Sequence, residues 1–166
     1  MDETFRQLLR GKRAHADPVA ILADVPFPAA GRVIDGYPHS IWQIVEHMNY
    51  WMEYDLGKIA GENPVYPNRA IESWPSHPDP ASEAQWQAAT RRFGELLAHL
   101  AELSESEAES LERIIRNVGP EHSPRQSTVH TMLWQVVVHN SYHVGQIALL
   151  RRQLDTWPPR RGGDTW

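Results

Sequence analysis

The sequence predicts an all-α fold, and more specifically a four-helix bundle. Apolar residues recur with helical spacing along most of the 166 residues, and residue pairs typical of helix N-termini precede several of these stretches. No alternating apolar and polar run of strand length is present, and no internal repeat is found. The length suits one domain. We expect this domain over residues 1–159, followed by a flexible tail at 160–166.

The N-terminal segment is expected to hold two short helices. Residues 2–10 show helical periodicity, and Asp17 followed by Pro18 is typical of an N-cap with proline at the first helical position. The second of these helices is expected to continue to about Val25. Prolines and a glycine then predict a loop over residues 26–39.

The next helix has clear start and end signals. Ser40 followed three residues later by Gln43 is a capping box, and the apolar periodicity after it continues to about Ala60. Gly61 is a typical residue for the end of a helix. Residues 62–80 contain five prolines, which predicts a long loop, and loops of this length often carry function.

A third long helix is predicted from Ser82 to about Leu103, because Ser82 and Gln85 form another capping box. The residues that follow are acidic, and a short helix is expected at about 105–116 with one face in solvent. Glycine and prolines interrupt the chain after it.

The last major helix is expected to open at Ser127 or Thr128 and to continue to about Leu154. With the divided N-terminal segment counted as one member, the prediction comprises four helices. Helix bundles place their metal and ligand sites between facing helices. Polar side chains on apolar helix faces are therefore the first candidates for function.

The composition excludes several classes of protein. Sixteen basic and 21 acidic residues give a net charge of −5, and without a basic stretch we expect no nucleic-acid partner. The chain contains no cysteine, which excludes disulfides, thiolate zinc sites, iron–sulfur clusters and a cysteine nucleophile. No apolar run approaches the roughly 18 residues of a membrane span, and the N-terminus lacks a signal pattern. We therefore expect a cytoplasmic protein without a membrane partner.

Nine histidines are present, and helical geometry singles out two of them on the last helix. At about 100° per residue, His139 and His143 lie on the apolar face of that helix, one turn apart. This spacing brings two imidazoles within reach of one ion, as in HExxH helices. On the earlier helix His47 lies at the margin of the apolar face, aimed at the seam between helices.

Three neutral imidazoles would leave at least one coordination position open, which is typical of a catalytic metal site. Imidazole suits Zn, Ni, Cu or Fe, so the ligand type alone does not select the metal. The alternative is a metal-free core in which Gln135, Asn140 and Gln146 hydrogen-bond the buried imidazoles.

The other polar motifs are weaker. Glu46 and Tyr142 are further candidates for proton transfer, and Trp42, Trp51 and Trp134 for either core packing or the wall of a pocket. A surface role is expected for the remaining histidines, which are His15, His39, His77, His99, His122 and His130.

Two segments resemble a known family. The stretch WQVVVHNSYHVGQIALLRRQL, residues 134–154, is similar to the closing helix of the DinB-like (damage-inducible, YfiT-like) metal-binding proteins. The stretch HSIWQIVEHMNYW, residues 39–51, resembles the family segment that contributes the first histidine. The resemblance spans about residues 1–159, but its specific content lies in these two segments.

The resemblance implies an up-down-down-up bundle, frequently a homodimer, with a divalent metal that is often Zn or Ni. Carried over residue by residue, the metal ligands are His47, His139 and His143. Gln146 neighbours the last two on the helix face, so we expect it either to orient an imidazole or a water, or to serve the helix interface.

Family members with an assigned role are largely low-molecular-weight-thiol S-transferases, including bacillithiol transferases and mycothiol-dependent isomerases. The resemblance therefore implies a metal-dependent enzyme on a small-molecule substrate, and specifically a thiol S-transferase. Because the chain has no cysteine, any sulfur nucleophile must arrive as a cosubstrate. A metal-dependent hydrolase, and a non-catalytic metal-binding protein associated with stress, are the alternatives.

Overall fold

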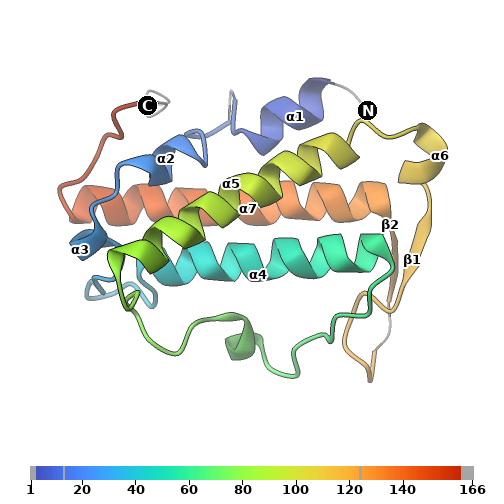
Figure 1. The fold of residues 1–166 in the computed structure, drawn as a ribbon, viewed down its shortest axis with the longest axis horizontal. Coiled ribbons are helices and arrows are strands. Elements are labelled where there is room, and N and C mark those ends of the chain that lie inside the picture. Colours follow the sequence, from blue (N-terminus) through green and yellow to red (C-terminus); the bar gives the residue numbers. More distant parts are fainter. Residues whose placement is uncertain (1–2, 13, 124, 162–166) are drawn as a thin grey trace.

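A computed structural model describes residues 3–12, 14–123 and 125–161. Its long helices are α4 (Ile41–Ala60), α5 (Glu83–Leu103) and α7 (Val129–Gln153). In Figure 1, α4 and α5 run in one direction, whereas the N-terminal segment and α7 run in the other. The predicted up-down-down-up helical bundle is confirmed. Most of the tail expected at 160–166 lies outside the described residues.

The N-terminal member of the bundle is broken into short pieces. They are α1 (Glu3–Leu9), α2 (Ala20–Ala23) and α3 (Phe27–Ala30). Asp17 Oδ1 accepts hydrogen bonds from the backbone N–H groups of residues 19 and 20 at the start of α2, although the N-cap residue of that helix is Val19. The second helix was predicted to end at about Val25 and ends at Ala23, whereas the loop predicted over residues 26–39 contains α3.

The capping signals correctly located the start of each long helix. Ser40 and Gln43 form the complete capping box at the start of α4, and Gly61 ends that helix in the left-handed region with φ of 86°. Ser82 Oγ accepts from the N–H of Gln85 at the start of α5. For α7 the N-cap is the threonine at position 128, whose side chain accepts from the N–H of Thr131.

A long connection carries the chain back along the bundle between α4 and α5, as Figure 1 shows. It contains a single 3₁₀ turn, η1 (Ala70–Ser73). Ser40 Oγ donates to the carbonyl of Pro78, and Gln43 Nε2 donates to the carbonyl of Pro75 at 3.0 Å. These bonds attach the connection to the first turn of α4.

A two-stranded antiparallel hairpin is the main departure from the predicted all-α fold. Strands β1 (Ile114–Arg116) and β2 (Gln126–Thr128) pair with Ile115 opposite Ser127. The short helix expected at about 105–116 is present as α6 (Ala108–Leu111), but it is shorter than predicted, because residues 114–116 form β1. Each strand has three residues, which is too short for an alternating pattern to stand out.

The core lies where α4 packs against both α5 and α7. Met48 and Met52 of α4 are fully buried, as are Leu133 and Ile147 of α7. The α4–α7 interface is therefore the position at which inward-facing polar groups of both helices meet. Within the described residues, no helix is both long and apolar enough to cross a membrane.

Candidate metal centre

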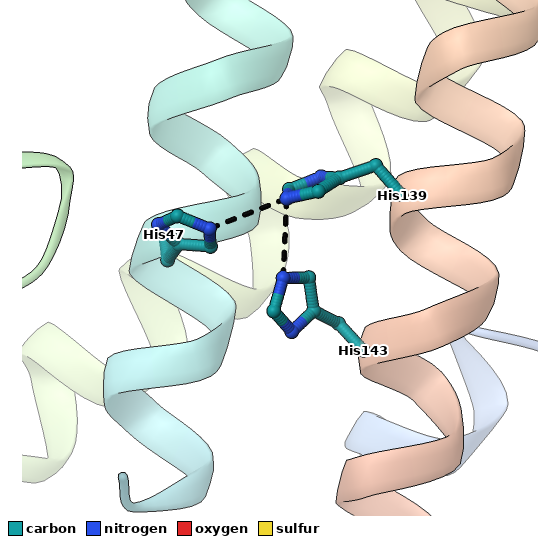
Figure 2. Close-up of side chains that lie close together, drawn as sticks. All are labelled: His47, His139 and His143. Carbon is teal, nitrogen blue, oxygen red and sulfur yellow. Dashed lines mark hydrogen bonds between the residues drawn. The ribbon is translucent and has the colours of Figure 1, made fainter. Parts of the chain in front are cut away.

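Three histidines from two helices meet at the α4–α7 interface. Nε2 of His139 lies 3.2 Å from Nε2 of His47 and 3.1 Å from Nε2 of His143. Figure 2 shows the His139 ring between the other two, with its nitrogen pointing toward both. The structure thus brings together the three side chains that the sequence singled out, from positions 92 residues apart.

The separations between these nitrogens suit a common ion. One nitrogen atom from each ring can be chosen so that all lie within 4.8 Å of one another. Two nitrogens bound tetrahedrally to Zn²⁺ at about 2.0–2.1 Å would lie about 3.3–3.4 Å apart. The donor set and the spacing therefore fit a divalent metal without large movement of the rings.

The other ring nitrogen of His47 is held by the long connection. Its Nδ1 lies 3.2 Å from the carbonyl oxygen of Ser73 and 3.0 Å from Ser73 Oγ. That hydroxyl donates to the carbonyl of Ala70 at 2.7 Å, so toward the imidazole it acts as an acceptor. Both contacts require a proton on Nδ1, which leaves the lone pair on Nε2 facing the other two rings.

Gln146 fixes the position of the imidazole proton of His143, as Ser73 does for His47. Its Oε1 lies 2.7 Å from His143 Nδ1, and its Nε2 donates to the hydroxyl oxygen of Tyr142 at 3.1 Å. Since the amide N–H is directed to Tyr142, the oxygen accepts from the imidazole, and Nε2 of His143 again carries the lone pair.

Burial keeps the imidazoles neutral. It lowers the pKa of His47 to about 3, with further lowering by the charges of His143 and His139. Burial, followed by the charge of His143, lowers the pKa of His139 to about 4, and burial also lowers the pKa of His143. At neutral pH each ring is therefore a neutral imidazole, which is the form that binds metals.

An aromatic stack supports His47 from the long connection. The ring of Trp74 stacks on His47 with centroids 3.8 Å apart and planes 9° apart. Trp74 also stacks on His39, with ring centroids 3.7 Å apart and planes 12° apart. The expected surface role for His39 was wrong, because its ring is part of this stack and its Nδ1 is buried.

A cavity of about 420 Å³ opens beside the imidazoles, with His139 in its wall. The apolar part includes Trp51, one of the tryptophans that the sequence offered for a pocket wall. Trp42 instead lies in the core, with 6% of its surface exposed. The rest of the wall comes from α4, the long connection, the hairpin and α7: Met52, Tyr54, Asp55, Tyr66, Val118, Gly119, Arg125, Gln126, Ser127, Thr131, Met132, Gln135 and Val136.

Several sequence candidates lie elsewhere or act differently. Glu46 forms an ion pair with Arg92 at 3.6 Å and lines a separate hollow, not the cavity beside His139. Asn140 donates to the sulfur of Met52 at 3.4 Å. Tyr142 contacts the His143 ring edge-on, with centroids 5.0 Å apart, and its hydroxyl accepts from Gln146.

Sequence reasoning missed Ser73 and Trp74 because their contacts depend on where the long connection crosses α4. The only available signal was the length and proline content of that connection, which pointed to the segment but not to the residues.

One of three comparisons with known proteins identifies a family. A search of the curated proteins and a search of the solved structures gave no significant match. The model of the DinB superfamily matches residues 10–147, a range that contains all three clustered histidines. The chain belongs to the DinB superfamily.

Proposed function

We propose that this protein is a divalent-metal-dependent enzyme that joins a low-molecular-weight thiol to a small electrophile. The observation that carries the proposal is the convergence of three neutral imidazole nitrogens beside a cavity, in a chain without cysteine. Zn or Ni is the proposed metal, since both suit imidazole ligands. His47, His139 and His143 would hold it.

The role of the chain is to prepare this site. Ser73 and Gln146 fix the Nδ1–H tautomers of His47 and His143, and burial excludes the protons that would compete with the ion. When bound, a divalent cation supplies Lewis acidity, which lowers the pKa of a coordinated thiol or water toward neutrality. A three-histidine set leaves a position for such a group.

The cavity would hold the electrophile. Its wall combines the apolar surfaces of Trp51, Tyr66 and Met132 with a few polar side chains, which is typical of small-molecule sites. Because His139 belongs to both the cluster and the cavity wall, a molecule in the cavity lies next to the imidazoles.

The proposal is tested with Zn- or Ni-loaded protein and the fluorogenic electrophile monobromobimane. L-Cysteine, bacillithiol, mycothiol and glutathione are supplied in turn as the thiol. We expect a metal-dependent rate with at least one of them, and a loss of about 100-fold in His143→Ala, which removes one ligand. His99→Ala, an exposed histidine on α5, is the matched control and should keep the full rate.

The other outcomes decide against thiol transfer. Cleavage of a chromogenic ester without any thiol, at a rate that needs the metal and His143, would identify a hydrolase instead. Metal binding with neither activity would leave a protein that binds metal without turnover.

A further inference from the structure

An acidic and a basic side chain line the cavity that has His139 in its wall. Asp55 reaches it from α4, and Arg125 from the segment that leads into β2. Among the described residues, no salt bridge includes either side chain. The cavity therefore presents a carboxyl and a guanidinium group that are not paired with each other.

Asp55 is held on the cavity side of α4. It follows His47 by eight residues, which places it about 80° around the helix and about 12 Å farther along the axis. Burial raises the pKa of this carboxyl to about 7.

Arg125 is held by the backbone of the hairpin loop. A Cβ atom added to Gly119 would lie 3.1 Å from Arg125 Cγ and 3.3 Å from Cδ, so the aliphatic part of the arginine lies directly against this glycine. The N–H of Val118 also donates to the carbonyl of Arg125 at 3.1 Å. These contacts hold the arginine at the cavity wall.

A partly buried carboxylate without a partner is costly, and a ligand cation would relieve that cost. A guanidinium binds carboxylates with two parallel hydrogen bonds. We infer that this cavity binds a small zwitterion, whose ammonium pairs with Asp55 and whose carboxylate pairs with Arg125. If the proposed function is right, on which this further step rests, the zwitterion is the thiol.

The test uses probes that lack one charge at a time. Cobalt-loaded protein is titrated with L-cysteine, with N-acetyl-L-cysteine, which lacks the ammonium, and with L-cysteine methyl ester, which lacks the carboxylate. The sulfur-to-cobalt absorption band reports binding. L-Cysteine also chelates metals through its amine, so the deciding comparison is between protein variants with the same probe.

Each variant should affect only the probes that carry the matching charge. Asp55→Asn should weaken binding of L-cysteine and its methyl ester about tenfold, but not binding of N-acetyl-L-cysteine. Arg125→Gln should weaken binding of L-cysteine and N-acetyl-L-cysteine about tenfold, but not binding of the ester. The matched controls Glu95→Gln and Arg91→Gln, both exposed on α5, should change none of these affinities.

Calorimetry of the metal-free protein with L-serine separates this inference from the proposed function. Binding of L-serine that depends on Asp55 and Arg125, with no binding of any thiol, would keep the zwitterion site and refute thiol transfer. Thiol binding that neither variant changes would refute the zwitterion site and keep thiol transfer. Failure of both thiols and L-serine to bind would overturn the inference together with the proposed function.

Discussion

At the scale of single residues, the candidate site separates into side chains that the sequence indicates and side chains that only the fold supplies. His139 and His143 were predictable because a spacing of four residues on one helix fixes their relative position. His47 required the additional assumption that its helix faces α7, which the structure confirms. Ser73 and Trp74 were not predictable, because no local pattern fixes where a proline-rich connection crosses a helix.

Asp55 provides a prediction about stability and pH. Its pKa rises from 3.8 to about 7 on folding because of burial, so the folded protein holds this proton more tightly than the unfolded chain. The contribution of Asp55 to stability is therefore complete below about pH 4 and is lost as the pH rises through about 7.

Asp55→Asn removes this titration. We expect the variant to match the wild type near pH 4 and to exceed it at about pH 8 by on the order of 2 kcal/mol, a value discounted for residual hydration of the carboxyl. Urea denaturation at both pH values measures the difference. A variant less stable than the wild type at the higher pH would contradict the assigned burial.

At the scale of elements, caps and breakers explain why the long helices were predicted well. Ser40, Ser82 and Thr128 each accept a backbone N–H at the start of a helix, and these signals are local in sequence. The hairpin was missed because its two short strands stabilise each other only across an intervening loop, which a local pattern does not report. That loop nevertheless supplies part of the cavity wall, including Arg125.

Ser40 links the capping of α4 to the long connection that holds His47. Ser40→Ala should lose the cap, which costs about 1 kcal/mol, and should also release the carbonyl of Pro78. Because Ser73 and Trp74 lie on the same connection, we expect metal affinity to fall as well. The cap-only control is Ser82→Ala at the exposed start of α5, which should lower stability by a similar amount without changing metal affinity.

Urea denaturation and metal titration of both variants provide the measurement. Equal metal affinity in Ser40→Ala and Ser82→Ala would show that the connection does not position His47.

At the scale of the whole molecule, the order of helices brings the site together. The long connection returns the chain so that α5 runs in the same direction as α4, and α7 then runs antiparallel to α4 and packs against it (Figure 1). The sequence indicated this arrangement only through its resemblance to a family, since helical periodicity gives the faces of helices but not their neighbours. Because α4 and α7 pack against each other, histidines from both helices form one cluster.

The central claim is that one divalent ion binds the chain through these three imidazoles. The most direct measurement is the metal content and affinity of protein purified without an affinity tag, by elemental analysis and competitive Zn²⁺ titration. We expect one ion per chain, and an affinity reduced about 100-fold or more when His47, His139 or His143 is changed to alanine, whereas His99→Ala should match the wild type. An affinity unchanged in all three alanine variants would contradict the claim.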